Sequence, residues 1–167
     1  MGAFGELIDA ILFLFFTVIA VAASLIGSQT CLPPSLFPNF LVDLKNWCAT
    51  EFGDYLINQK PHFVVGIFWL ELVFQWPLAL LNICGFDCQI LVQTTCLMYG
   101  VSVISTMVPM LSELVWSGKA SDKLLTMYFP FMGLGVLATL RGLLLPHFAK
   151  TIPTDGKKPS LARKKRA

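Results

Sequence analysis

One carboxylate inside a long apolar segment is the first candidate for chemistry. Glu71 lies in FWLELVFQWP (residues 68–77) and is the only Asp, Glu, Lys or Arg between positions 61 and 86. A charged acid near the middle of a bilayer costs about 2.5–3.5 kcal/mol, so it normally faces a bundle interior or a cavity and marks function. Gln75 follows at i+4, on the same face of a helix, where it can orient the acid. Glu71 and Gln75 are therefore candidate binding residues.

A purely structural role for Glu71 is the alternative. Polar side chains in membrane helices also hydrogen-bond to neighbouring helices and hold them together. Pro77 lies shortly after Glu71, and helix-breaking residues are tolerated in spans where neighbours satisfy the freed backbone groups. The sequence by itself leaves both roles open.

The segments that carry these residues are predicted to cross a membrane. The chain has 167 residues, of which 56% are hydrophobic and 13% charged, whereas soluble domains are about 45–50% apolar and about 25% charged. A membrane-spanning helix needs about 20 mostly apolar residues. Four segments meet this requirement, at 7–27, 63–83, 91–115 and 124–148. We predict an all-α membrane protein that forms a four-transmembrane-helix bundle.

Basic residues predict the orientation of the bundle. Seven of the twelve Lys and Arg residues lie from Lys150 onward, and cytosolic segments are enriched in Lys and Arg. The C-terminus is therefore expected in the cytosol, and four spans return the N-terminus to the same side. The first span begins MGAFGELIDA, without a basic residue, which favours a retained helix over a cleaved signal peptide.

Helix depth predicts that three spans bring side chains to one level of the membrane. At 1.5 Å per residue, Glu71, Thr106 and Phe131 lie about 12, 13 and 10 Å below the same face. Pro109 and Pro130 lie near that depth and are expected to kink their helices. A polar stripe along the third segment consists of Tyr99, Ser102, Thr106 and Glu113. We therefore expect an internal ligand cavity that is apolar and has few polar anchors.

The sequence carries no motif for metal, cofactor or nucleic-acid chemistry. It lacks a glycine-rich phosphate loop, a G-x-S-x-G turn and an H-E-x-x-H helix. His62 and His147 stand at the ends of predicted spans. We expect no metal, no cofactor and no nucleic acid. Cys31 and Cys48 are the cysteines of the 28–62 loop, where one disulfide could form.

The C-terminal sequence RKKRA predicts a cellular location. Lys164 and Lys165 are fourth and third from the end, which resembles the dilysine retrieval signal of endoplasmic reticulum membrane proteins. The alternative is a basic segment that meets anionic lipid, worth about 1 kcal/mol per charge near the surface. We expect a multi-pass protein of the endoplasmic reticulum membrane, with both termini in the cytosol.

Five short motifs occur in a specific order along the apolar segments. They are LPPSLFP, EFGDYL, ELVFQWP, STMVPMLSE and YFPF. In this order and spacing the chain resembles the sigma-2 receptor family of the EXPERA superfamily, with details closer to plant than to animal members. The superfamily includes emopamil-binding protein, a sterol Δ8–Δ7 isomerase. The resemblance implies an EXPERA-type four-helix domain over residues 1–148, followed by a basic cytosolic tail at 149–167.

The resemblance also implies a ligand pocket and its residues. The family's pocket glutamate corresponds to Glu71, and the last position of the fourth-helix motif is Phe131, without the family's hydroxyl. Animal receptors carry an aspartate that pairs with ligand amines where this chain has Gly27, so cationic ligands are expected to bind weakly. Asp54 could substitute only if the first loop folds inward. The implied ligand-binding residues are Phe52, Asp54, Glu71, Gln75, Tyr99, Thr106, Tyr128 and Phe131.

The expected function is sterol and amphiphile binding in intracellular sterol homeostasis or trafficking. The alternative is a sterol Δ8–Δ7 isomerase, which needs an acid/base set that can move a proton between carbons. The one histidine inside a predicted span is His147, at the very end of 124–148, and Ile67 lies one turn before Glu71, so catalysis is not expected. The partners implied by the resemblance are a sterol or oxysterol, membrane lipids, a Niemann–Pick C type sterol transporter and a second copy of the chain.

Overall fold

The computed structural model describes residues 3–85 and 89–144, and these residues form helices without a strand. The 149–167 tail, with Lys164 and Lys165, lies outside the described residues. In chain order the elements are α1 (Ala3–Ala22), the π-helical turn η1 (Ala23–Gly27), α2 (Ser28–Cys31), the 3-10 turn η2 (Pro34–Leu36), α3 (Asn39–Phe52), α4 (Tyr55–Gln59), α5 (His62–Leu70), the π-helical turn η3 (Glu71–Gln75), α6 (Trp76–Cys84), α7 (Gln89–Trp116) and α8 (Asp122–Leu144).

Four continuous helical stretches are long and apolar enough to cross a membrane. They run over Gly5–Cys31, His62–Cys84, Val92–Trp116 and Asp122–Leu143. The predicted all-α bundle with four membrane spans is thereby confirmed. The first span extends four residues beyond its predicted end, because η1 and α2 continue the helix to Cys31.

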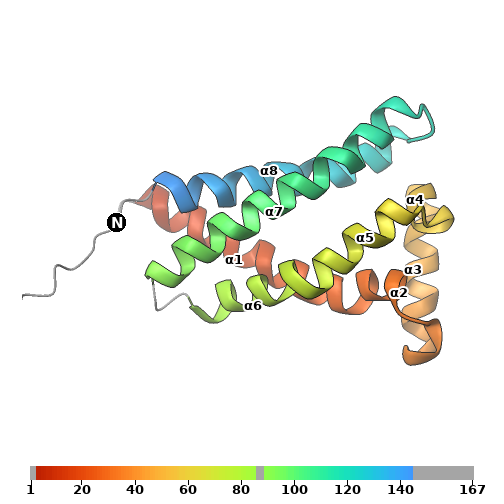
Figure 1. The fold of residues 1–167 in the computed structure, drawn as a ribbon, viewed down its shortest axis with the longest axis horizontal. Helices are drawn as coiled ribbons and strands as arrows, with labels where there is room; N and C mark the ends of the chain where they lie inside the picture. The colour runs from red at the N-terminus through yellow and green to blue at the C-terminus, as the bar shows by residue number, and fades with distance from the viewer. Residues whose placement is uncertain (1–2, 86–88, 145–167) are drawn as a thin grey trace, which may run out of the picture.

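The spans associate in two pairs that are joined into one bundle. In Figure 1, α7 and α8 run side by side along most of their length, and α1 lies beside the α5–α6 span near α6. The helices α7 and α8 continue through Pro109 and Pro130 to Trp116 and Leu144. The prolines therefore lie inside continuous helices and do not end them.

Glycines allow α7 and α8 to approach closely. A Cβ atom added at Gly100 would lie 2.7 Å from the Gly135 carbonyl oxygen, and one at Gly142 would lie 2.9 Å from Leu97 Cα. Real Cβ atoms almost never come so near to backbone atoms, so larger residues would push the helices apart. Small residues at such interfaces are typical of membrane helices, where close van der Waals packing drives association.

The 28–62 segment, which was predicted as a loop, is mostly helical. In Figure 1, α3 runs across one end of the bundle at a steep angle to the spans. Gly53 ends α3 in the left-handed conformation, with φ 65°. Asp54 then caps α4 and turns the chain back toward the second span. Cys31 and Cys48 lie within this segment as free thiols, without a disulfide between them.

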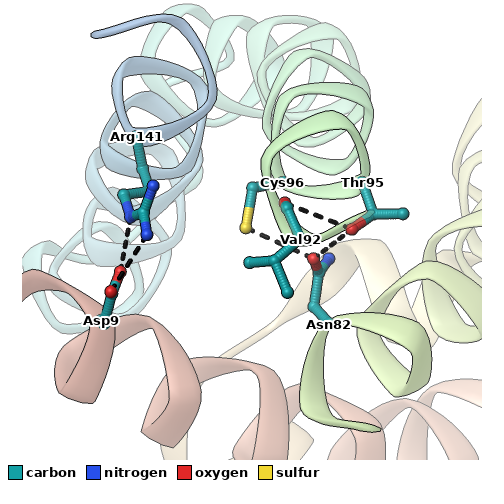
Figure 2. Close-up of polar contacts among 6 residues, drawn as sticks. All are labelled: Asp9, Asn82, Val92, Thr95, Cys96 and Arg141. Carbon is teal, nitrogen blue, oxygen red and sulfur yellow. Dashed lines mark hydrogen bonds and ion pairs between the residues drawn. The ribbon is translucent and has the colours of Figure 1, made fainter. Parts of the chain in front are cut away.

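The opposite end of the bundle contains a layer of buried polar side chains to which every span contributes. Figure 2 shows Asp9 of α1 facing Arg141 of α8, and Arg141 Nη2 donates to Asp9 Oδ2 at 3.0 Å. Arg141 Nε donates to the other carboxylate oxygen, so the ion pair is bidentate. Asn82 of α6 accepts hydrogen bonds from Thr95 and Cys96 of α7. This polar layer fixes the rotation of the four helices relative to one another.

Removing one charge of the ion pair should destabilise the bundle. The Arg141 side chain is only 8% exposed, so Asp9→Asn would leave a buried guanidinium without a counter-charge. We expect a loss of about 3 kcal/mol in the free energy of unfolding, measured as a lowered thermal midpoint in detergent micelles. Glu6→Gln, on the exposed face of the same helix, is the control and should change little. Equal midpoints for the two variants would contradict the structural role of the pair.

Candidate ligand pocket

A pocket of about 250 Å³ lies between the four spans and α3. Its walls are dominated by aromatic, aliphatic and methionine side chains. The lining includes seven of the eight predicted site residues, namely Phe52, Glu71, Gln75, Tyr99, Thr106, Tyr128 and Phe131. The helices thus gather these residues around one space, and their role toward a ligand stays a prediction. Mostly apolar walls with a few polar groups are typical of small-molecule sites.

Two π-helical turns flank the pocket on neighbouring spans. Ser28 N–H donates to the Ala23 carbonyl at η1, and Trp76 N–H donates to the Glu71 carbonyl at η3, both across five residues. Pro77 is the second residue after η3 and has no N–H to donate to the preceding turn. Such turns appear mostly as single bulges inside α-helices and often at functional sites. Here they lie where Gly27 and Glu71 enter the pocket lining.

Glu71 presents an unpaired carboxylate to this apolar space. Among the residues that the structure describes, none donates a hydrogen bond to its side chain or forms an ion pair with it. Gly27 lies directly opposite, where an added Cβ atom would be 3.7 Å from Glu71 Oε2 and 3.6 Å from the Phe68 ring. The missing side chain at Gly27 therefore leaves room beside the carboxylate. The arrangement can receive a polar group at the end of an apolar molecule.

Gln75 serves the helix interface and does not orient Glu71, contrary to the sequence-based expectation. Its Nε2 donates to Ser102 Oγ at 3.0 Å and to Thr106 Oγ1 at 3.4 Å on α7. The expectation assumed α-helical spacing from Glu71, whereas the π-helical turn shifts the direction of side chains four residues apart. Thr106 in turn donates to the Val103 carbonyl at 2.9 Å. Two members of the polar stripe of α7, Ser102 and Thr106, thus accept hydrogen bonds from the second span.

Asp54 lies behind the pocket and not in its lining. The side chain is fully buried, and its Oδ1 accepts from the backbone N–H groups of Leu56 and Ile57 at 3.0 and 3.2 Å. Its Oδ2 accepts from the Tyr128 hydroxyl at 2.7 Å. Both carboxylate oxygens therefore have partners within the protein. In this arrangement Asp54 acts on the pocket through the position of Tyr128.

Two aromatic contacts hold Tyr99 at the pocket wall. Its ring meets Phe16 edge to face at a centroid distance of 5.0 Å, and it meets Phe15 at 6.0 Å in a similar geometry. Such pairs add about 0.5–1.5 kcal/mol beyond their buried area. Phe15 also packs against Phe131, with ring centroids 6.4 Å apart. The aromatic residues of three spans thereby form one rigid wall.

Lys45 is a pocket residue that sequence reasoning missed. It lies on α3, is buried, and its Nζ donates to the Gln29 carbonyl at 3.4 Å. Burial and the positive charge of Lys60 lower the pKa of Lys45. The spacing Leu41, Lys45, Ala49, one turn apart on one face, was the signal that could have placed it inward. The pocket therefore contains an ammonium group as well as the Glu71 carboxylate.

Sequence comparison assigns the chain to a family. The pattern of the EXPERA (EXPanded EBP superfamily) family matches residues 40–142, from the start of α3 to the end of α8. The chain belongs to this family. It is 23% identical over 163 residues to the sigma intracellular receptor 2 of Xenopus tropicalis, covering 89% of this chain and 95% of that protein.

Two further relatives match a shorter stretch at higher identity. The sigma intracellular receptor 2 proteins of Macaca fascicularis and Homo sapiens are each 31% identical over 91 residues, which covers 53% of this chain and 51% of theirs. The family match of this EXPERA protein begins after the first span, so it does not include Gly27. The pocket is therefore lined both by residues of the matched region and by residues of the first span, which lies outside that region.

Two variants of Asp54 test whether its side chain stabilises the fold by capping α4. Asp54→Ala should lower the free energy of unfolding by about 1–2 kcal/mol, because the α4 cap and the Tyr128 partner are lost. Asp54→Asn should retain most of the stability, since asparagine caps helices as well as aspartate does. Thermal unfolding in detergent measures both. If the Asn variant were as unstable as the Ala variant, the capping interpretation would be wrong.

Proposed function

We propose that this EXPERA protein binds sterols or similar amphiphiles in the pocket, with Glu71 as the polar anchor. The observation that carries the proposal is the carboxylate of Glu71, which has no described protein partner and faces a mostly apolar space. A buried polar group without a partner is costly. A ligand hydroxyl or amine at this position would supply the missing hydrogen bond. The relatives named sigma intracellular receptor 2 support a receptor-like role.

The pocket walls favour a molecule with an extended apolar body. The lining includes aromatic residues of α1 and α8 and the flexible side chains Met107, Met110 and Met127. Methionine is unbranched and polarisable, so it adapts to irregular apolar shapes. Rigid aromatic rings and adaptable methionine side chains together suit the flat apolar body of a sterol. Its hydroxyl end would point toward Glu71 and Gly27.

The charges of the pocket favour neutral ligands over cationic ones. The resemblance to animal receptors implies an aspartate for amines where this chain has Gly27, and the pocket holds Lys45 as well. Lys45 repels a ligand ammonium and partly offsets the attraction of Glu71. We therefore place sterols ahead of cationic amphiphiles as ligands. This preference for sterols over cationic amphiphiles rests on the charges of the described pocket residues and not on the shape of the pocket.

The proposed cellular setting is the endoplasmic reticulum membrane, with both termini in the cytosol. The dilysine pattern at Lys164 and Lys165 and the basic tail support it. A role in intracellular sterol homeostasis or trafficking, a Niemann–Pick C type transporter as partner and a homodimer complete the proposal. These last features rest on the family resemblance.

Substitution of Glu71 tests the anchor directly. Glu71→Leu should weaken binding of a labelled sterol about tenfold, which corresponds to one buried hydrogen bond. Glu71→Gln keeps a donor and similar size, so its effect should be smaller. Equilibrium binding to purified protein measures the affinity, and Glu113→Leu, on α7 outside the pocket lining, is the matched control. Wild-type affinity in a folded Glu71→Leu protein would show that Glu71 is not the anchor.

The isomerase alternative has a separate test. The described pocket lining offers Glu71, Lys45, Cys48 and two tyrosines as titratable groups, without a histidine. An isomerase needs an acid/base set on the sterol's reacting carbons. We expect no Δ7 sterol when the chain is expressed in a yeast strain that lacks its Δ8–Δ7 isomerase, as measured by mass spectrometry. Restored Δ7 sterol would make the protein an enzyme and overturn the proposal of binding alone.

A further inference from the structure

The helix α3 presents three different faces to its surroundings. One face is turned toward the bundle, with Leu41, Lys45 and Ala49 buried. Cys48 and Phe52 lie on the same side and, together with Lys45, line the pocket. This face explains why α3 stays attached to the spans. The other two faces are exposed, and their chemistry differs.

The first exposed face is polar. Asn39, Asp43, Asn46 and Thr50 recur at intervals of four, three and four residues and are all exposed. This spacing places them in one stripe along the helix. A polar stripe of this kind is suited to contact with water.

The second exposed face is apolar and runs parallel to the polar one. Phe40, Leu44 and Trp47 recur with the same helical spacing and are 67%, 41% and 59% exposed. Leu36, in the turn before α3, adds a fourth apolar side chain that is 66% exposed. In water such a stripe would be an aggregation hazard or a binding surface. A helix with one polar and one apolar exposed face is typical of the membrane interface.

The position of α3 agrees with such an interface. It lies across the end of the bundle where the second span begins at His62 and the third ends at Trp116 (Figure 1). Phe63 and Trp116, the aromatic residues at these two span ends, are 42% and 85% exposed. Aromatic residues gather where spans leave the bilayer, because their rings sit at the level of the lipid headgroups. The apolar stripe of α3 thus lies at the same end of the bundle as these exposed aromatic residues.

We propose that α3 lies in the membrane interface, with the stripe of Phe40, Leu44 and Trp47 inserted among the lipids of the leaflet at that end of the bundle. The polar stripe then faces water, and the third face forms part of the pocket wall. The partner of this surface is the headgroup and upper acyl region of a phospholipid bilayer. This inference does not depend on what the pocket binds.

Fluorescence quenching of Trp47 tests the proposal. Full-length protein and its Trp47→Phe variant are placed in phosphatidylcholine nanodiscs, and the difference between their emission spectra reports Trp47. We expect the strongest quenching of this difference signal by lipids brominated close to the headgroup, weaker quenching by lipids brominated at the chain end, and little by aqueous iodide. Quenching by iodide alone would place Trp47 in water and overturn the proposal. Quenching by neither agent would show protein cover, as in contact with a second copy, and would also overturn it.

A second measurement uses matched pairs of substitutions on the two exposed faces. Phe40→Ser with Leu44→Ser removes the apolar stripe, and Asn46→Ser with Thr50→Ser alters the polar stripe at the same spacing. In nanodiscs, we expect faster backbone amide exchange over α3 in the first double variant and unchanged exchange in the second. Exchange in the spans should stay unchanged in both, which shows that the bundle remains folded. Equal exchange over α3 in the two double variants would contradict insertion of the apolar stripe.

Discussion

The constraint on which this structure depends is that backbone groups inside a bilayer must find their partners within the protein. No water is available there, so an open chain segment would leave several costly unsatisfied groups. The four described spans are accordingly helical. Two π-helical turns depart from α-helical hydrogen bonding: η1 near the end of the first span and η3 within the second. Both turns border the pocket, and they also contact each other, with η1 against α3 and η3 against α7. Irregular backbone is thus placed where a cavity allows it.

The two ends of the bundle differ in how their polar side chains are paired. At the end near Asp9, each span contributes a polar side chain to a layer whose two charged residues form an ion pair. At the other end the spans enclose the pocket, and α3 crosses above it. Close glycine contacts hold α7 and α8 together along their length. A bundle fixed at one end in this way can carry an unpaired carboxylate nearer the other end without losing its helix register.

The pocket itself shows how neighbouring polar groups divide into structural and available ones. Gln75 and Asp54 have their hydrogen-bonding atoms engaged with α7, α4 and Tyr128. Glu71 has no such partner among the described residues. The difference follows from direction, because η3 turns Gln75 toward α7 while Glu71 faces Gly27. The pocket lining therefore combines the Glu71 carboxyl group, which has no described protein partner, with the amine of Lys45.

The sequence alone determined the class of protein and predicted which side chains of three spans would meet. Hydropathy located all four spans, and a rise of 1.5 Å per residue brought Glu71, Thr106 and Phe131 to one level. Only the tertiary structure decided which way the side chains point. It turned Gln75 away from Glu71, placed Asp54 behind the wall and brought Lys45 into the pocket. Hydropathy and depth are local properties of one helix, whereas partners depend on how each helix is rotated against its neighbours, and that rotation is set by packing across the bundle.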